Sequence, residues 1–523
     1  MTESARAKDL AKDLEGLDPE LREVLEPFDD HNQRLIDNVH PLAWSNPKPA
    51  DRYHLLVVGG GTAGLVSAAG AAGLGARVAL VEKRLLGGDC LNYGCVPSKA
   101  LIRAARAWHA AQGPNPFGAP TTVEGTGDFG AVMERMRKLR ADISRHDSAE
   151  RFRGLGIDVF IGEGRFVASD ALDVGGQRLH FRKAVVATGA SPMILPIPGL
   201  SESEYLTNET VFSLTALPPR LAIIGGGPIG CELAQSFARF GSRVSIFDIA
   251  PHILVREDAD AAEIVQQALT RDGVDLQLRT NIQKITSRGG ETVIFFERDG
   301  SSQELRCDRL LLAVGRVANV HGIGLEAAGV EFSKHGVEVD DRLRTSNRRI
   351  YAVGDVATRF KFTHMADALA RIAIQNSLFF GRKRASDLVV PWCTYTDPEI
   401  AHVGMYAEDA EKAGIKIETV TVPLSEVDRS VLEGSDQGFL RLHIQKGKDR
   451  VLGATLVADH AGDMLGELSL AVTHKIGLGK IAATIHAYPT QAEVIKKAAD
   501  SWRRGKLTPT VSKVFEIFFK IFR

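Results

Sequence analysis

The chain has 523 residues, of which 44% are hydrophobic and 25% are charged, and its formal net charge is -1. This length predicts roughly two to four domains, and the balanced charge excludes the strongly basic surface typical of proteins that bind nucleic acid. Only five cysteines are present, which argues against a secreted disulfide scaffold. Because the sequence shows no secretory signal and no apolar run of about 18 residues, we expect a cytoplasmic protein.

The first 49 residues predict a helical extension that ends in a proline-rich linker. Apolar and acidic residues recur at helical spacing from Ala7 to Val24, and Pro41, Pro47 and Pro49 follow. No chemically reactive pattern occurs in this segment, so residues 1–49 suggest no function of their own.

A strand–turn–helix–strand pattern follows the extension. Residues 54–58 are a buried-strand run, the turn Gly59-Gly60-Gly61-Thr62-Ala63-Gly64 comes next, and a second strand over 77–81 ends at Glu82. The glycines allow a tight turn, close approach of a pyrophosphate and close helix packing, while Glu82 can accept hydrogen bonds from a ribose diol. The segment therefore predicts a dinucleotide site.

Two cysteines lie just beyond this pattern, in the segment 87–99. Cys90 and Cys95 are five residues apart, so they can form and break a disulfide with little backbone movement. Beside a redox cofactor such a pair can accept two electrons and pass them to a substrate. The alternative is a pair of buried structural cysteines.

The same strand–turn–helix–strand layout returns further along the chain. Residues 221–224 form the strand, Gly225-Gly226-Gly227-Pro228-Ile229-Gly230 the turn, and a strand over 243–247 ends at Asp248. An acid at this point repels a 2′-phosphate, so Asp248 favours NADH over NADPH if this site holds a nicotinamide nucleotide. Arg256, further on, argues in the other direction.

Two such folds with a Cys-x-x-x-x-Cys pair resemble the class I pyridine nucleotide–disulfide oxidoreductases, over roughly residues 50–500. The chain resembles the mercuric-reductase-like and dihydrolipoyl-dehydrogenase-like members of that family. Four further segments carry the resemblance, in chain order: Ala187-Thr188-Gly189-Ala190, Ala313-Val-Gly-Arg-Val-Ala-Asn319, Val353-Gly354-Asp355 and Pro398-Glu-Ile-Ala-His-Val-Gly404.

The resemblance implies an α/β fold with two Rossmann-like dinucleotide-binding domains and a C-terminal α+β dimerisation domain. It also implies a homodimer whose active site is shared between the subunits. The expected parts are an extension (1–49), an FAD-binding domain (50–215 and 341–388), an NAD(P)-binding domain (216–340), a dimerisation domain (389–502) and a basic tail (503–523).

The family implies that FAD binds the first fold and NAD(P)H the second, and that Cys95 faces the flavin while Cys90 meets the substrate. Lys99 and Glu232 match a pair that lies near the flavin. The expected FAD-binding residues are Gly59, Gly61, Thr62, Ala63, Gly64, Glu82, Lys83, Gly88, Asp89, Lys99, Gly164, Thr188, Gly189, Asp355 and Thr363. The expected NAD(P)-binding residues are Gly225, Gly227, Gly230, Glu232, Asp248 and Gly315. No resident metal site is expected.

The sequence departs from the family's thiol-acting members near its C-terminal end. Those members carry a His-Pro followed by a glutamate, and here the segment reads His486-Ala-Tyr488-Pro489, with Glu493 at the family's spacing. An unperturbed tyrosine has a pKa near 10 and is a poor base at neutral pH. Turnover of lipoamide or glutathione is therefore disfavoured, and His486, two residues away, is only a weak candidate to replace the base.

The tyrosine at position 488 is a point of resemblance to mercuric reductase. In such an enzyme a histidine base is less necessary, because a soft metal ion held by two thiolates leaves no thiol that needs a proton. The other metal-relaying cysteines of that enzyme are missing: there is no upstream Cys-x-x-Cys domain and no cysteine after Cys393. We expect catalysis by Cys90, Cys95, Tyr488 and Glu493. The remaining cysteines, Cys231, Cys307 and Cys393, are predicted to be packing residues.

The leading hypothesis is an FAD-dependent, NADH-using reductase whose acceptor is a metal ion such as Hg(II), a disulfide or a quinone-like molecule. The alternative is a dihydrolipoyl dehydrogenase. A second alternative, a redox sensor or scaffold at the inner membrane surface, rests on residues 503–523, which combine six basic residues with many apolar ones. This tail predicts a basic amphipathic helix on an anionic membrane, or else a helix docked on the protein or on a partner subunit.

Overall fold

The computed structural model describes residues 18–112, 117–118 and 127–522. The chain divides into two compact units, each made of two segments. The first unit comprises the chain up to Pro251 together with Asp272–Asp387, and the second comprises His252–Arg271 and Leu388–Arg523. Each unit is described below by itself. The helical spacing expected between Ala7 and residue 17 lies outside the described residues.

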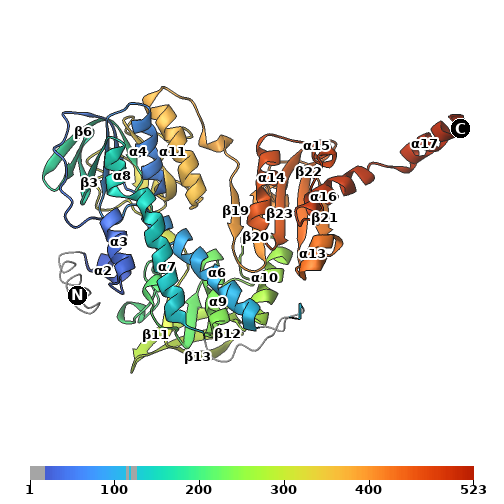
Figure 1. Ribbon diagram of the computed structural model, residues 1–523, viewed down its shortest axis with the longest axis horizontal. Coiled ribbons are helices and arrows are strands. Elements are labelled where there is room, and N and C mark those ends of the chain that lie inside the picture. Colours follow the sequence, from blue (N-terminus) through green and yellow to red (C-terminus); the bar gives the residue numbers. More distant parts are fainter. Residues whose placement is uncertain (1–17, 113–116, 119–126, 523) are drawn as a thin grey trace. The chain divides into compact units, whose positions relative to one another are not determined.

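The first unit contains a sheet of mostly parallel strands in the order β3-β2-β1-β6-β5-β4, with β18 also paired to β6 (Figure 1). The apolar run predicted as a strand is β1, whose central residues are fully buried and pair with β2 in parallel register, Leu55 opposite Val78. Helices α4 and α11 pack beside each other next to this sheet. The bounds are Tyr53–Val58 (β1), Val78–Glu82 (β2), Ile157–Ile161 (β3), Gly164–Ala168 (β4), Ala171–Val174 (β5), Gln177–Val186 (β6), Ile350–Ala352 (β18), Thr62–Gly73 (α4) and Thr363–Leu378 (α11).

The first unit also contains a second parallel sheet, in the order β10-β9-β8-β14, and an antiparallel sheet β11-β12-β13. Helix α9 packs on the parallel sheet and also contacts α6, which begins at Cys95. The mixed α/β architecture expected from the sequence is therefore present. The bounds are Arg220–Ile224 (β8), Arg243–Phe247 (β9), Asp275–Gln277 (β10), Asn281–Arg288 (β11), Glu291–Arg298 (β12), Ser301–Cys307 (β13), Arg309–Leu312 (β14), Cys95–Gln112 (α6) and Pro228–Phe240 (α9).

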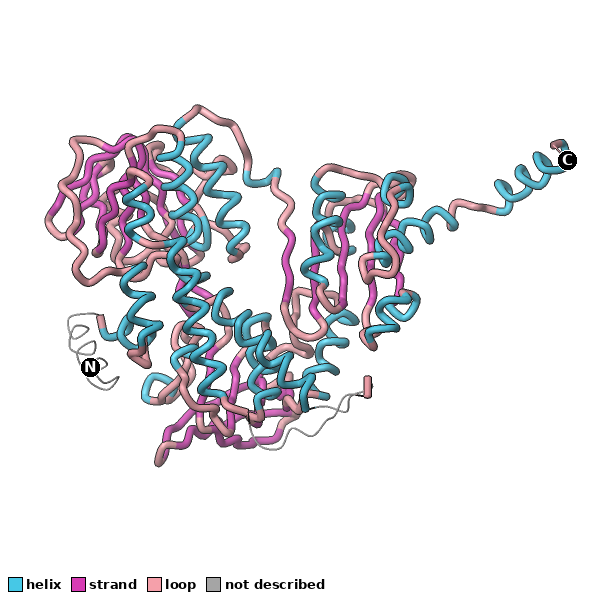
Figure 2. Tube along the Cα trace, in the orientation of Figure 1, coloured by secondary structure: helices cyan, strands magenta, loops and turns pink. Residues whose placement is uncertain are grey.

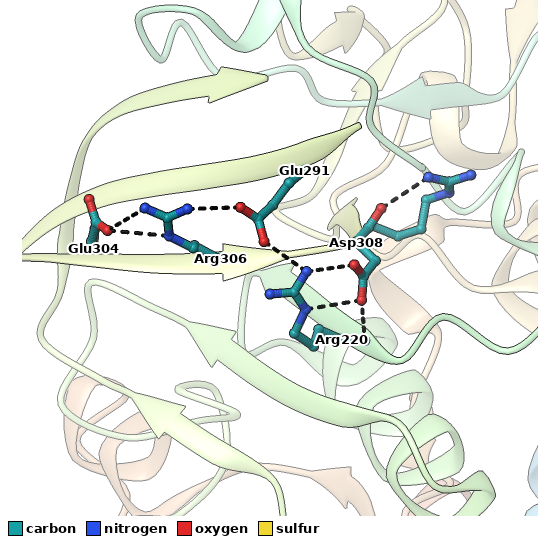
Figure 3. Close-up of polar contacts among 6 residues, drawn as sticks. Arg220, Glu291, Glu304, Arg306 and Asp308 are labelled. Atoms are coloured by element: carbon teal, nitrogen blue, oxygen red, sulfur yellow. Dashed lines mark hydrogen bonds and ion pairs between the residues drawn. The ribbon is translucent and has the colours of Figure 1, made fainter. Parts of the chain in front are cut away.

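An ion-pair network joins the antiparallel sheet to β8 (Figure 3). Arg220 donates to both carboxylate oxygens of Asp308, at 3.1 and 2.7 Å, and lies 2.9 Å from Glu291. Glu291 in turn pairs with Arg306, which also contacts Glu304. These side chains are partly or largely exposed, so the network contributes little to the free energy of unfolding. It mainly orients strands β12 and β13 relative to β8 of the parallel sheet.

The N-terminal extension packs against the first unit. Helices α2 (Pro19–Val24) and α3 (Asp30–Val39) are present, and α3 contacts α7 (Phe129–Ser144). The apolar face of α3 is completely covered. Beyond α3, Trp44 and Asn46 donate to backbone carbonyls of β3, the edge strand of the first sheet, at 3.1 and 3.0 Å.

The second unit is built on an antiparallel sheet in the order β19-β20-β23-β22-β21 (Figure 2). Strand β23 is buried along its whole length, and helix α14 packs on β20 and β23. Helix α10 belongs to this unit. Asp258, just before this helix, and Asp260, in its first turn, bind Arg441 of β22 at 2.8 and 2.5 Å. The bounds are Pro391–Thr394 (β19), Glu399–Gly404 (β20), Ile417–Pro423 (β21), Phe439–Gln445 (β22), Val451–Ala458 (β23), Ala259–Arg271 (α10), Ala461–Thr473 (α14), Leu478–Ala483 (α15) and Glu493–Arg504 (α16).

The chain closes with helix α17 (Pro509–Ile521), which begins at a Thr508 cap followed by Pro509 in its first turn. None of its residues is buried, although most of them are apolar. Among the described residues, no helix combines the length and apolar character needed to cross a bilayer.

Candidate active site

The first glycine-rich turn has the geometry that the sequence predicted. Gly59 has a φ of +104°, and a Cβ there would overlap the Ala187 carbonyl. A Cβ at Gly64 would overlap the Gly59 carbonyl, so helix α4 packs against the turn only because both positions lack side chains. At the end of β2, Glu82 accepts from Gly60 N at 2.5 Å and from Arg84 N at 2.6 Å. Burial raises the pKa of Glu82.

The second turn repeats this construction. Gly225 has a φ of +111°, and a Cβ there would lie 2.5 Å from the Ala313 carbonyl oxygen, while a Cβ at Gly230 would overlap Gly225. Asp248, at the end of β9, accepts from Gly226 N at 2.7 Å and from Ala250 N at 2.8 Å. In both turns the acid at the end of the second strand holds the middle of the glycine turn.

Both turns fit a dinucleotide pyrophosphate. Helix α4 begins after Gly61 and α9 after Gly227, and among the described residues no side chain caps either N-terminus. The first N–H groups of each helix are thus available to an anion, and the helix dipole favours negative charge there. Thr62 and Ala63 form the first turn of α4, as the nucleotide interpretation requires.

The two cysteines lie on consecutive helices. Cys90 is in helix α5 (Gly88–Asn92), and Cys95 is the first residue of α6. Contact with the Cys90 thiol lowers the pKa of Cys95 to about 6; Thr363 and Lys99 act in the same direction, whereas burial opposes them. The same contact, together with burial, raises the pKa of Cys90. Cys95 is therefore the thiolate of the reduced pair near neutral pH.

Further predicted residues gather around this pair. Thr363 Oγ1, at the start of α11, lies 3.4 Å from Cys95 Sγ. Lys99, one turn into α6, binds Glu232 of α9 at 2.8 Å. The Glu232 side chain is nearly buried, which makes this contact between α6 and α9 a shielded ion pair. Gly88 packs against the first turn, since a Cβ there would lie 2.6 Å from Gly61 Cα.

An arginine that the sequence analysis did not single out connects two predicted FAD-binding acids. Arg316 lies 2.8 Å from Asp89 and 3.9 Å from Asp355, and it donates to the Ala190 carbonyl at 2.6 Å. Asn208, also missed, donates to Asp89 at 3.0 Å. Burial raises the pKa of Asp355. The signal for Arg316 was its place in the segment Ala313–Asn319, which the resemblance had already marked.

The two crossover segments between the sheets are joined side by side. Thr188 Oγ1 donates to the Asn319 carbonyl at 2.7 Å, and the Asn319 amide donates to the Thr188 carbonyl at 2.9 Å. Gly189 and Gly315 have φ values of +70° and +127°, which explains why these positions are glycine. Two other predicted residues lie away from these contacts: Gly164 packs in β4 against Val81, and Lys83 is exposed after β2.

Tyr488 and Glu493 both lie in the second unit, where each side chain has a different partner. Tyr488 is 68% exposed, and its hydroxyl donates to Asp428 at 2.8 Å. This bond raises the pKa of Tyr488, so the phenol stays protonated at neutral pH and serves as a donor rather than a base. Glu493 begins α16 and lies 3.8 Å from Lys497. No motif or spacing in the sequence indicates Asp428.

His486 is poorly placed to replace the missing base. Residues 486–488 are not a strand, and the two side chains differ in environment: the His486 side chain is buried, whereas Tyr488 is exposed. Both ring nitrogens of His486 already have partners, Glu467 at 3.0 Å and the Thr484 carbonyl at 3.1 Å.

The other three cysteines pack into the protein. Cys231 and Cys307 are fully buried, and burial raises the pKa of both thiols, that of Cys307 to about 12. Cys393 is partly buried at the edge of the core of the second unit. None of the three resembles the low-pKa thiol at position 95.

The sequence matches two families. Residues 53–370 match the pyridine nucleotide-disulphide oxidoreductase family, and residues 390–499 match the dimerisation domain of pyridine nucleotide-disulphide oxidoreductases. A mercuric reductase of Staphylococcus aureus is 32% identical over 511 residues, 95% of this chain and 92% of that protein. A dihydrolipoyl dehydrogenase of Geobacillus stearothermophilus is 33% identical over 455 residues, 85% of this chain and 95% of that protein.

Solved structures give the same assignment. The HOCl-induced flavoprotein disulfide reductase RclA of Escherichia coli has a TM-score of 0.76 and 28% identity, covering 86% of this chain and 99% of that chain. LpdA of Mycobacterium tuberculosis has a TM-score of 0.77 and 26% identity, covering 87% of this chain and all of that one. The second family match indicates a homodimer. The chain therefore belongs to the pyridine nucleotide-disulphide oxidoreductase family and is an oxidoreductase that uses FAD and NAD(P).

Proposed function

We propose that this enzyme reduces a soft metal ion such as Hg(II) with electrons from NADH, through the Cys90–Cys95 pair. Two features taken together carry the proposal: the pKa of Cys95 is low, and position 488, where a thiol-acting relative has histidine, holds a protonated tyrosine. The mercuric reductases among its relatives agree with a metal acceptor. Disulfide and quinone-like acceptors are the competing choices.

The reaction balances in two halves. When bound by the first glycine turn and Glu82, FAD would accept a hydride from NADH and supply two electrons to the disulfide, which with one further proton from solvent would become a dithiol. The two thiols then release their protons to solvent as they bind the metal ion, and the two thiolates give it two electrons and close the disulfide again, so Hg(II) leaves as the neutral metal. No thiol has to receive a proton in the second half, which is why a tyrosine is compatible with turnover at position 488.

The chain's own residues supply charge and orientation. Cys95 is proposed to face the flavin as the thiolate, and Cys90 to meet the acceptor. Lys99, held by Glu232, places a positive charge one turn after Cys95 and stabilises its thiolate. In the homodimer, Tyr488 and Glu493 of one subunit are proposed to complete the site of the other.

The glycine turns carry the proposed nucleotide roles. The first, with Glu82, would hold the FAD pyrophosphate and ribose, and the second, with Asp248, those of NADH. We also propose the domain bounds given above from the sequence; the family match that ends at residue 370 and the one that starts at 390 support a boundary between them.

The electron route is tested by substituting each cysteine in the FAD-loaded enzyme. Reduction of Hg(II) by NADH should fall by about 10²-fold or more in Cys95→Ser and Cys90→Ser, while Cys307→Ser, a buried thiol in β13, serves as the matched control. In the wild-type enzyme, a long-wavelength absorbance band should arise from contact between the Cys95 thiolate and the flavin. This band should appear as the pH rises through about 6 and be lost below that pH. A Cys95→Ser enzyme that reduces every acceptor at the wild-type rate would exclude this route.

The competing acceptors are tested directly. Lipoamide turnover should be much slower than Hg(II) reduction, and Tyr488→His should raise it, because a histidine at this position can exchange a proton near neutral pH. Fast lipoamide turnover by the wild-type enzyme would favour the dihydrolipoyl dehydrogenase alternative.

We propose NADH as the preferred donor. Asp248 is held at the end of β9 by two backbone N–H groups, where it would repel a 2′-phosphate, and residues 249–251 (Ile-Ala-Pro) offer no cation to compensate. Ile249 is 81% exposed, so a cation could be introduced there without disturbing the core. The double variant Asp248→Ala/Ile249→Arg should shift the ratio of kcat/KM toward NADPH by roughly tenfold or more. A wild-type preference for NADPH would contradict the proposal.

A second proposal concerns helix α17, which we infer lies on an anionic membrane surface. Lys513, Glu516 and Lys520 recur at i, i+3 and i+7 and share one narrow face, and every other residue from Val514 to Ile521 is apolar. The apolar side chains stay about half or more exposed: Val514, Phe515, Ile517, Phe518, Phe519, Ile521 and Phe522. Arg503, Arg504 and Lys506 add positive charge just before the helix, which suits anionic headgroups.

Vesicle sedimentation tests this contact. The full chain should bind vesicles of anionic phospholipid, bind neutral vesicles weakly, and lose binding when residues 505–523 are removed or Phe515 and Phe518 are changed to serine. Leu74→Ser, another exposed apolar residue, is the matched control and should bind like wild type. If the tail instead docks on a partner subunit, the deletion will weaken the dimer and leave vesicle binding unchanged.

A further inference from the structure

The N-terminal extension, residues 18–49, contacts the segment that leads to Cys90. Leu86 N donates to the Val39 carbonyl at 3.1 Å, and His40 Nδ1 contacts the Arg84 carbonyl. Val39 and Leu86 are both fully buried, so these contacts lie in the packed interior beside the first glycine turn. The extension thus supports the backbone between β2 and α5 at two successive points.

A third contact runs through Arg140 of helix α7, whose side chain is 1% exposed. Arg140 donates to Asn32 Oδ1 at 2.7 Å and to the Asn92 carbonyl at 2.9 Å. Asn32 is itself fixed, because its amide donates to the carbonyls of Leu25 and Pro27 at 2.8 and 3.0 Å. A chain of buried hydrogen bonds therefore leads from the extension to Asn92.

Asn92 closes the helix that carries Cys90. It is the last residue of α5, where backbone carbonyls lack partners within the helix, and Arg140 satisfies one of them. The Asn92 amide donates to the carbonyls of Leu86 and Gly88 at 3.1 and 2.8 Å, which folds the segment back on itself. The position of Asn92 therefore determines the position of the Cys90 backbone two residues earlier.

We propose that the N-terminal extension is a positioning element for the redox pair, with Asn32 acting through Arg140 on Asn92 to fix Cys90 relative to Cys95. This inference rests on the proposed electron route through Cys90–Cys95. The extension lies before the family match, which begins at residue 53.

The physical basis is that a buried guanidinium needs acceptors. If Asn32 loses its amide, one N–H edge of Arg140 has no acceptor, and the side chain must move or admit water. Either change weakens the bond to the Asn92 carbonyl. A hydrogen bond to a charged group is strong enough that its loss should raise local opening of residues 86–95 roughly tenfold.

The experiment compares two asparagines of the extension in the FAD-loaded enzyme. Asn32→Ala removes the contact with Arg140, and Asn46→Ala is the matched control, because Asn46 exchanges two hydrogen bonds with the Ile161 backbone of β3 and none with Arg140. The readouts are hydrogen exchange of residues 86–95 and the rate at which iodoacetamide labels Cys90 after reduction with dithiothreitol. Asn32→Ala should raise both roughly tenfold, and Asn46→Ala should change neither.

Arg140→Met separates the relay from the fold of the extension. Methionine leaves Asn32 bonded to Leu25 and Pro27 but removes the donor to the Asn92 carbonyl, so Cys90 should be labelled roughly tenfold faster than in Asn46→Ala. If Asn32→Ala and Arg140→Met both label Cys90 at the rate of Asn46→Ala, the proposal is wrong. If Asn32→Ala does not fold, Arg140→Met decides alone: faster labelling supports the relay, and the rate of Asn46→Ala overturns it.

The outcome is distinguishable from a failure of the proposed function. Loss of the electron route would be seen as unchanged acceptor reduction in Cys95→Ser, whatever the behaviour of Asn32. Conversely, a working route with identical exchange and labelling in Asn32→Ala and Asn46→Ala would refute only the positioning role.

Discussion

The two ends of the chain carry amphipathic helices with opposite fates. In α3 the apolar residues Leu35, Ile36 and Val39 are at most 1% exposed, whereas in α17 Phe518 is 48% and Ile521 69% exposed. The difference is in the polar anchors. The extension has buried hydrogen bonds to the first unit, while α17 has its own cap and a surface with nothing described against it. An amphipathic pattern thus predicts a helix and its apolar face, but not what covers that face.

The largest effect should come from deleting an apolar side chain at each end. Leu35→Ala leaves a cavity between the extension and the first unit and should lower the free energy of unfolding by about 2–5 kcal/mol. Phe518→Ala removes a side chain that is already in water and should leave the unfolding curve unchanged. Urea titration followed by circular dichroism measures both. Equal losses at the two ends would show that α17 is covered in solution.

A smaller effect should come from the helix caps. Asp29 caps α3, accepting from His31 N at 3.1 Å and Asn32 N at 2.9 Å, and also pairs with the nearly buried Arg137 at 2.6 Å. Asp29→Ala should therefore cost about 1–3 kcal/mol of stability. Thr508→Ala removes the cap of α17 and should reduce its helicity without moving the unfolding midpoint. The contrast fails if Thr508→Ala is as destabilising as Asp29→Ala.

The smallest effect should come from the exposed ion-pair network of Figure 3. Glu304→Ala removes a carboxylate that binds Arg306 at 3.1 Å on the surface. Because solvent and salt screen such pairs, the unfolding midpoint should not change measurably in a thermal scan at physiological ionic strength. This variant sets the lower limit of the comparison: a clear loss here would mean that exposed ion pairs, and not burial alone, determine the size of these effects.

Much of the candidate site could be predicted because its signals are local. A glycine turn between a strand and a helix, with an acid about 20 residues later, is determined by contacts within one βαβ unit, and both copies have the predicted geometry. The contact between Lys99 and Glu232 also agrees with the resemblance. The fold class followed from the order of the same motifs.

The rest depended on contacts between distant segments. Arg140 lies 108 residues from Asn32, and Arg316 meets Asp89 from another part of the chain, so no spacing or periodicity could indicate either pair. Asp428, which holds Tyr488, is 60 residues away from it. Tertiary packing positions buried cations such as Arg140 and Arg316, so their partners can be identified only once the fold is known.

The contacts of Trp44 and Asn46 with β3 bear on solubility. β3 is an edge strand, and an uncovered edge offers its free N–H and C=O groups to any other extended chain. The Asn46 amide occupies both the N–H and the carbonyl of Ile161, and the Trp44 indole takes the Val159 carbonyl, so this margin cannot serve as a template for strand addition. The linker that joins the extension to the first sheet is therefore also a guard against edge-to-edge aggregation.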